Sequence, residues 1–147
     1  SSDFRVRYGI DDRFMVLGVA SPWTERKGLS DFVRLAGELD SDKFAIVLIG
    51  LSDKQKREMP AGVVGLGRTD SPKELAEAYS TADVFFNPTR EDNYPTTLLE
   101  AQACGTDAIT YAVGGSGEAI VREGSCSTTS YEDALASIKR MCAKGSR

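Results

Sequence analysis

The chain has 147 residues, enough for one domain with a buried core, and it is 41% hydrophobic and 27% charged, an ordinary globular composition. It has a net charge of −4, no His, and three cysteines (Cys104, Cys126 and Cys142) without C-x-x-C spacing. These features argue against binding of nucleic acid through bulk charge, a zinc site, a disulfide framework and any His-based catalysis within these residues. No apolar run reaches the roughly 18 residues that span a bilayer, and the first residues lack a signal-peptide pattern, so we expect a cytoplasmic protein.

Strand-like and helix-like segments alternate along the chain. Residues 14–20 form a continuous apolar run typical of a buried parallel strand, and apolar residues then recur at helical spacing over 29–39. Ser71, Pro72 and Glu74 predict the start of another helix, as an N-cap, a first-turn proline and a capping-box partner. This helix is predicted to cover 72–81. The other predicted strands are 44–49, 63–66, 84–86 and 108–111, and the other predicted helices are 97–104 and 131–142.

This alternation, with short connections, predicts right-handed crossovers between parallel strands. We therefore expect one α/β domain, a Rossmann-like doubly wound parallel sheet with helices on both faces. Ligands of such sheets bind beyond the carboxyl ends of the strands. The loops that begin near Ser21, Gly50, Asn87 and Ala112 are thus the places where a site is expected.

The loop after the first predicted strand, residues 21–28, carries Arg26 and Lys27 close to the start of a helix. Free amides at a helix N-terminus attract an anion, and a diphosphate would gain a point charge from Lys27 and a forked donor from Arg26. A solvated pair of basic residues is the alternative. The loop does not have the G-x-x-x-x-G-K-[ST] pattern of a phosphate loop.

The loop and helix start over residues 87–101 contain the largest group of polar residues. Carboxylates such as Glu91 and Asp92 bind the vicinal hydroxyls of sugars and ribose, and the amides around residues 96–98 suit a phosphate. In the alternative interpretation, Thr97 and Glu100 form a capping box and residues 91–93 are a plain turn. The glycine cluster at 114–117 either brings backbone amides to a charged ligand or is only a tight turn.

Taken together, these motifs resemble the retaining glycosyltransferases of family 4, which have the two-domain GT-B architecture. No single motif is specific, but the ordered set is, and it covers most of residues 14–118. The matching segments occur in the family's order at 23–28, 79–84, 87–89, 91–97, 99–101, 103–106 and 114–115.

The resemblance implies roles for individual residues. Lys27 would contact the diphosphate of a nucleotide sugar, and two acids separated by seven residues would contact the transferred sugar and the ribose. These acids are Asp92, where Glu is commoner in the family and Glu91 lies adjacent, and Glu100. The implied catalytic residues are Lys27, Glu91, Asp92 and Glu100, and the implied substrate-binding residues are Arg26, Asn93, Tyr94, Thr96, Thr97 and Gly115.

Two further positions depart from the family's pattern. Pro22 stands where many members have an Arg five residues before the phosphate-binding Lys. Asp107 stands where the family usually has the Pro of a Gly-Thr-Pro sequence. The resemblance also implies that no metal or cofactor is needed, with the nucleotide sugar itself as donor substrate.

The implied function is transfer of a hexosyl-type sugar, with retention, from a nucleotide-diphosphate carrier to a glycan or lipid-linked acceptor in bacterial surface polysaccharide synthesis. Residues 14–147 would be the carboxyl-terminal, nucleotide-sugar-binding domain. Residues 1–13 would be the segment that arrives from a missing amino-terminal acceptor domain, through which the protein would reach the inner face of the membrane. The chain by itself is then expected to be inactive.

Two alternatives come from other classes of protein. A receiver-like signalling domain is also a doubly wound sheet, but it needs acids after its first strand, and Asp11 and Asp12 precede that strand. A Lys after the fifth strand is missing as well. The second alternative is a non-catalytic nucleotide-binding module, which the sequence does not separate from half of a transferase.

Overall fold

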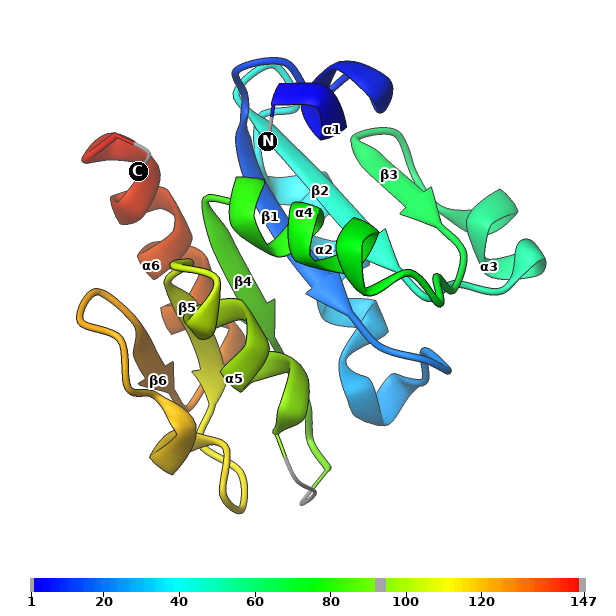
Figure 1. Cartoon of the computed structure of the whole chain (residues 1–147). Coiled ribbons are helices and arrows are strands. Elements are labelled where there is room, and N and C mark those ends of the chain that lie inside the picture. The colour runs from blue at the N-terminus through cyan, green and yellow to red at the C-terminus, as the bar shows by residue number, and fades with distance from the viewer. Residues whose placement is uncertain (1, 92–94, 146–147) are drawn as a thin grey trace.

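The apolar runs predicted as strands form one parallel sheet with the strand order β3-β2-β1-β4-β5-β6 (Figure 1). The structure, a computed structural model, describes residues 2–91 and 95–145. Each neighbouring pair of strands in this order is parallel. The strands are β1 (Phe14–Val19), β2 (Phe44–Ile49), β3 (Val63–Leu66), β4 (Val84–Asn87), β5 (Ala108–Tyr111) and β6 (Cys126–Thr128). The order grows outward in both directions from β1 and β4, which confirms the doubly wound α/β fold.

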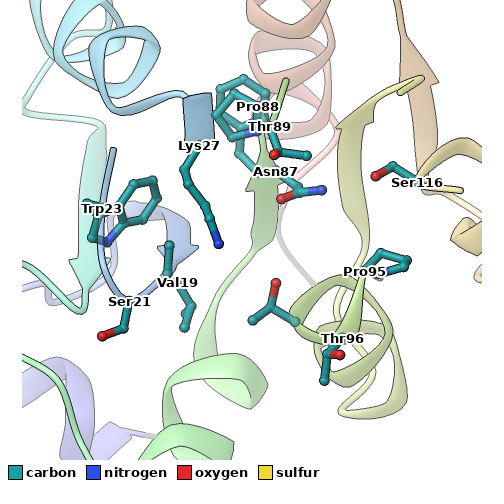
Figure 2. A pocket seen from close by; sticks show the side chains of 13 residues that line it. Val19, Ser21, Trp23, Lys27, Asn87, Pro88, Thr89, Pro95, Thr96 and Ser116 are labelled. Atoms are coloured by element: carbon teal, nitrogen blue, oxygen red, sulfur yellow. The ribbon is translucent and has the colours of Figure 1, made fainter. Parts of the chain in front are cut away.

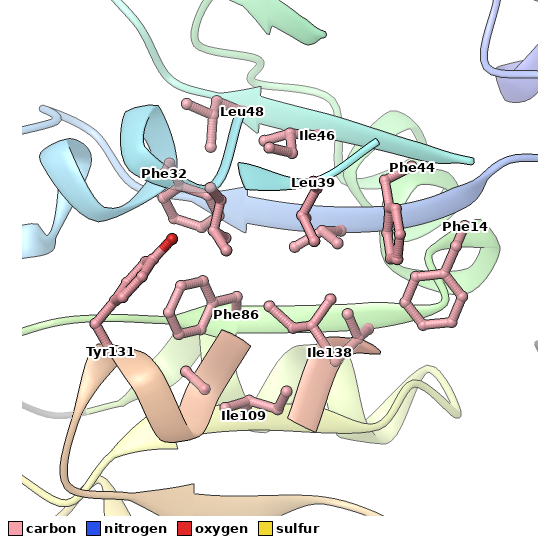
Figure 3. Close-up of a cluster of buried hydrophobic side chains, with 14 of the residues drawn as sticks. Phe14, Phe32, Leu39, Phe44, Ile46, Leu48, Phe86, Ile109, Tyr131 and Ile138 are labelled. Atoms are coloured by element: carbon pink, nitrogen blue, oxygen red, sulfur yellow. The ribbon is translucent and has the colours of Figure 1, made fainter. Parts of the chain in front are cut away.

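Helices cover both faces of the sheet, because successive residues of each strand point to opposite faces and both sets are apolar. The helices are α1 (Ser2–Arg7), α2 (Leu29–Glu38), α3 (Asp53–Glu58), α4 (Pro72–Thr81), α5 (Thr96–Ala103) and α6 (Tyr131–Ala143), with 3-10 turns η1 (Glu25–Lys27) and η2 (Gly117–Ala119). Val16 belongs to the core layer under α2 and α6, and Leu17 belongs to the layer under α1, α4 and α5. Figure 3 shows the first layer, in which Phe32 and Ile138 face Phe86 of β4.

Gly18 of β1 allows α2 to pack closely on the sheet. A Cβ atom at this position would lie 2.5 Å from Cζ of Phe32, which is too close for any side chain. The Phe32 ring fills that space and packs edge-on against Trp23, with ring centroids 5.5 Å apart. The loop that leaves β1 is therefore tied to the core immediately after the strand ends.

Besides the 3-10 turns, the described residues contain two α-helices and one strand that were not predicted from the sequence: α1, α3 and β6. Helix α3 buries none of its side chains, so it has no apolar periodicity to reveal it. Its start does carry a signal, because Ser52 and Gln55 form a reciprocal capping box. Strand β6 has three residues at the edge of the sheet, too few for a recognisable pattern.

Residues 2–13 pack onto this domain. Phe4 and Ile10 are fully buried in the core layer that contains α4 and α5. The Arg5 guanidinium donates to the Thr81 carbonyl at 2.8 Å and to Asp83 Oδ2 at 3.0 Å. The arrival of this segment from another domain stays a prediction, but its own residues complete the core at the amino end of the sheet.

Candidate functional site

Residues of α5 line two cavities. The β1–β4 cavity, of about 230 Å³, is lined by Val19, Ala20, Ser21, Trp23, Lys27, Phe86, Asn87, Pro88, Thr89, Pro95, Thr96, Thr97 and Ser116 (Figure 2). The α4–α5 cavity, of about 400 Å³, is lined by Thr69, Asp70, Ser71, Pro72, Leu75, Ala76, Tyr79, Glu100, Ala103 and Cys104. The first turn of α5 faces one cavity and its later turns face the other.

Lys27 reaches the β1–β4 cavity because the loop after β1 is anchored on both sides. The indole Nε1 of Trp23 donates to the Ile49 carbonyl at 2.9 Å, and Trp23 is 5% exposed. Thr24 caps η1, and its Oγ1 accepts from the Lys27 amide at 3.3 Å. The Lys27 side chain projects into the cavity in Figure 2, and its Nζ lies 3.8 Å from Glu91 Oε2.

Gly28 joins η1 to α2 in a conformation that glycine adopts most easily. Its φ is +90°, and a Cβ there would lie 2.3 Å from the Pro88 carbonyl oxygen. The loop after β1 can therefore lie directly against the loop after β4. A backbone bond reinforces this contact, because the Arg90 amide donates to the Arg26 carbonyl at 2.7 Å.

A buried carboxylate that the sequence analysis did not single out holds the loop after β4. Asp31 of α2 is 7% exposed and accepts from the Tyr111 hydroxyl at 2.6 Å and from Nη2 of Arg90 at 3.0 Å. Burial, followed by the hydrogen bond to Asp31, raises the pKa of Tyr111 above its ordinary value, so the hydroxyl remains a donor. Since Arg90 is thus held at both backbone and side chain, Glu91 is directed toward Lys27.

Helix α5 begins at Thr96, with Pro95 at the N-cap position and no side-chain cap. Thr97 is therefore inside the helix, and the alternative interpretation of Thr97 and Glu100 as a capping box is wrong. The first amides of a helix have no partner within it. Because Thr96 and Thr97 line the β1–β4 cavity, the start of α5 and Lys27 face the same space.

Glu100 lies one turn further along α5, at the wall of the α4–α5 cavity. Its Oε1 accepts from the hydroxyl of Tyr79, a residue of α4, at 3.0 Å. The rest of this cavity is largely apolar, with Leu75, Ala76 and Ala103 among its lining residues. A carboxylate at the edge of an apolar cavity suits a ligand with one flat apolar part and adjacent hydroxyls.

Ser116 is a residue of the β1–β4 cavity that the sequence analysis did not select. It lies in the glycine turn after β5, is 1% exposed, and its buried Oγ has no hydrogen-bond partner among the residues that the structure describes. Figure 2 shows its hydroxyl directed toward the interior of the cavity. Leaving a buried hydroxyl unsatisfied costs about 1–3 kcal/mol, a cost that a ligand in the cavity can remove.

The residues predicted as a site are only partly brought together. Lys27, Thr96 and Thr97 line the β1–β4 cavity, Glu91 faces Lys27, and Glu100 lines the α4–α5 cavity. Arg26 and Gly115 are exposed and do not line either cavity, although Arg26 contributes its carbonyl and Gly115 precedes Ser116. The predicted residues Asp92, Asn93 and Tyr94 lie outside the described residues.

The departure from the family's pattern at Asp107 has a structural role. Asp107 precedes β5, and its Oδ1 accepts from Nε of Arg122 at 2.8 Å. This pair links the start of β5 to the segment before β6.

Over residues 2–91 and 95–145, no group of three or more His, Cys, Asp or Glu side chains is placed to hold a metal ion. Within the same ranges, none of the helices has the length and apolar character needed to cross a bilayer. Asp11 and Asp12 are exposed and precede β1, away from the position that a receiver domain requires.

Comparison with known proteins places these features in a family. Residues 13–143 match the family model described as glycosyl transferases group 1. The chain is 34% identical over 103 residues to an alpha-galactosylglucosyldiacylglycerol synthase of Streptococcus pneumoniae, a match that covers 64% of this chain and 27% of that protein.

Two solved structures have the same fold. HepE of Anabaena in complex with UDP-glucose superimposes with a TM-score of 0.82 at 16% identity, over 97% of this chain and 43% of HepE. WaaG, a glycosyltransferase involved in lipopolysaccharide biosynthesis, gives a TM-score of 0.77 at 21% identity, over 97% of this chain and 41% of WaaG. The chain thus spans less than half of the length of these relatives.

Proposed function

This chain belongs to the glycosyl transferases group 1 family, and on that premise we propose that it is the nucleotide-sugar-binding domain of a glycosyltransferase. The observation that carries this proposal is the position of α5 between two cavities of different chemistry. One cavity has a cation and a helix start, which suit a diphosphate. The other has an apolar lining and a carboxylate, which suit a nucleoside.

The diphosphate is assigned to the β1–β4 cavity. Lys27 and the first amides of α5 face this space, and both stabilise negative charge. The Lys27–Glu91 pair is partly exposed, with an N–O distance of 3.8 Å, and such pairs contribute only about 0–1 kcal/mol. A diphosphate carries more charge than Glu91 and can therefore attract the ammonium group more strongly. During transfer, the same groups would stabilise the charge that develops on the leaving diphosphate.

The nucleoside is assigned to the α4–α5 cavity, where Glu100 would accept hydrogen bonds from the ribose hydroxyls. The residues that face the two cavities, Thr97 and Glu100, are three positions apart on α5. This separation corresponds to an axial rise of about 4.5 Å. Such a distance is compatible with a diphosphate and a ribose joined by one phosphate ester.

We propose that the complete enzyme transfers a hexosyl-type sugar with retention to a glycan or lipid-linked acceptor in bacterial surface polysaccharide synthesis. The names of the relatives support this class, because they include a diacylglycerol glycoside synthase, a UDP-glucose complex and a lipopolysaccharide enzyme. An acceptor-binding domain outside the present residues would supply the rest of the cleft and the approach to the inner face of the membrane. Asp92 and Glu91 would orient the donor sugar, without a metal or other cofactor.

The test is calorimetric titration of the 147-residue chain with UDP, GDP, ADP and the corresponding nucleotide sugars. We expect weak binding of one nucleoside diphosphate and no transfer of sugar to an added acceptor. Lys27→Ala should weaken that binding by about 1–3 kcal/mol, as for a hydrogen bond to a charged group. The control is Lys139→Ala, which removes an exposed charge from α6 and should leave binding unchanged. Equal binding by the parent and Lys27→Ala would contradict the assignment of the diphosphate.

A further inference from the structure

Tyr79 connects α4 to the carboxylate of Glu100. It is 2% exposed, and its ring packs edge-on against Phe85 of β4, with centroids 5.8 Å apart. At the end of this fixed ring, the hydroxyl donates to Oε1 of Glu100 at 3.0 Å. Both side chains line the α4–α5 cavity. A buried donor with a packed ring therefore holds one oxygen of an exposed carboxylate.

The chemistry of the pair keeps the direction of this bond constant. Burial and the neighbouring Glu100 carboxylate raise the pKa of Tyr79 far above its ordinary value, so the phenol stays protonated and acts as donor. Each oxygen of a carboxylate offers two lone pairs. One lone pair of Oε1 is used by Tyr79, and Oε2 accepts no hydrogen bond from the residues that the structure describes, so it can accept from a ligand in the cavity.

We propose that Tyr79 is a positioning residue, which orients the Glu100 carboxylate toward the ribose hydroxyls of the donor nucleotide. This inference rests on the proposed function, in which Glu100 contacts the ribose. A free Glu side chain loses rotamer freedom when it binds a ligand, which opposes binding. Tyr79 imposes much of that order beforehand, so the ligand meets a carboxylate that already has the required orientation.

A purely structural role is the competing explanation, in which the Tyr79–Glu100 bond only links α4 to α5. The two roles differ in their dependence on the ligand. Loss of a structural link disturbs the fold and therefore lowers the affinity for all nucleotides alike. A positioning residue affects only the affinity for ligands that have the ribose hydroxyls, because only these hydroxyls contact the carboxylate.

The experiment compares Tyr79→Phe with the parent chain by calorimetry, using whichever of UDP, GDP and ADP the parent binds most tightly and its 2′,3′-dideoxy analogue. Tyr79→Phe keeps the ring that packs on Phe85 and removes only the hydroxyl. We expect the affinity for the ribonucleotide to fall about three- to tenfold, in line with the cost of ordering one side chain. The affinity for the dideoxy analogue should stay the same.

A matched control is Tyr8→Phe, which removes the same group from a tyrosine that packs against Phe4 with ring centroids 4.8 Å apart and lines neither the β1–β4 nor the α4–α5 cavity, and it should change neither affinity. A second variant, Glu100→Ala, leaves the buried ring intact and should abolish the preference for the ribonucleotide. The assignment of Tyr79 is overturned if Tyr79→Phe weakens the binding of both ligands equally or of neither. It is also overturned if Glu100→Ala still prefers the ribonucleotide over the dideoxy analogue. Absence of nucleotide binding by the parent would instead overturn the proposed function, and this assignment with it.

Discussion

At the amino end of β4, the polar side chains bind one another, whereas at its carboxyl end they face a cavity. Asp83 precedes β4, and its Oδ2 accepts from the Met15 amide at 2.8 Å and from Arg5 at 3.0 Å. Arg5 also donates to the Arg13 carbonyl at 2.8 Å. Beyond the other end of the strand, Lys27 contacts Glu91 at 3.8 Å, and the buried hydroxyl of Ser116 has no partner among the described residues.

This difference separates residues that stabilise the fold from residues that are available to a ligand. The Asp83 side chain is 3% exposed, and a buried charge of this kind is tolerated only when hydrogen bonds replace the lost water. At the carboxyl end Asp31 is satisfied in the same way by Tyr111 and Arg90, but Lys27 and Ser116 line the β1–β4 cavity. Substitutions at the amino end should therefore change stability, and substitutions at the carboxyl end should mainly change binding.

Asp83→Ala should have the largest effect. It removes the acceptor of the buried Met15 amide and the charged partner of Arg5, so we expect a loss of about 3–5 kcal/mol in the free energy of unfolding, as when one partner of a buried ion pair is removed. Chemical denaturation monitored by circular dichroism measures this loss. The exposed pair Arg68 and Asp70 offers a control, since Asp70→Ala should change stability by less than about 0.5 kcal/mol. Similar stabilities for Asp83→Ala and Asp70→Ala would contradict the conclusion that the polar groups at the amino end of β4 stabilise the fold.

Gly28→Ala tests a position at the carboxyl end where we expect both the stability of the fold and the affinity for the nucleotide to change. The added Cβ meets the Pro88 carbonyl at a residue whose φ is +90°. We therefore expect a loss of stability of about 1–3 kcal/mol from the strained backbone, together with weaker nucleotide binding because the loops that carry Lys27 and Glu91 must separate. Gly37→Ala is the control, because a Cβ there meets no atom within 4 Å. Unchanged binding by Gly28→Ala would show that this loop contact does not position the site.

Glu100→Gln should change binding without changing the fold. The amide oxygen can still accept from Tyr79, but the second acceptor becomes a donor, so binding of the ribonucleotide should weaken by about 1–3 kcal/mol. Stability should change by less than about 0.5 kcal/mol. Calorimetry with ribose and 2′-deoxyribose nucleotides separates the two effects, since the deoxy ligand should be much less sensitive. Equal binding of the ribonucleotide by variant and parent would contradict a ribose contact.

Ser116→Ala should have a small effect on stability, and the sign of that effect is what the experiment tests. Removing a buried hydroxyl that has no partner should leave the free energy of unfolding unchanged or raise it by up to about 1 kcal/mol. Ser137→Ala makes the same change at a buried serine whose Oγ accepts from Arg140 at 3.0 Å, and it should lower stability. Thermal denaturation compares them, and a clear loss of stability for Ser116→Ala would show that its hydroxyl is bonded in solution. Weaker nucleotide binding by Ser116→Ala would place this hydroxyl at the ligand.

The sequence by itself determined the strands that are apolar runs and predicted the loops in which the candidate site lies. Buried parallel strands are continuous apolar runs, so 44–49, 63–66 and 108–111 were predicted with the boundaries that the structure has. The fold class then placed the loops containing Lys27 and Glu91 at one end of the sheet, because parallel strands all end there. Elements without an apolar pattern, such as α3, were not predicted.

Only the tertiary structure decided which polar groups meet. Asp31 and Tyr111 are 80 positions apart, and Tyr79 and Glu100 are 21 apart, yet each pair shares a hydrogen bond. Residues 97 and 100 had the spacing of a capping box, but α5 begins one residue earlier and its neighbour α4 supplies the partner of Glu100. Local patterns report burial and backbone conformation, which depend on near neighbours. The pairing of distant side chains depends on strand order and helix packing, and these arise only when the whole sheet has formed.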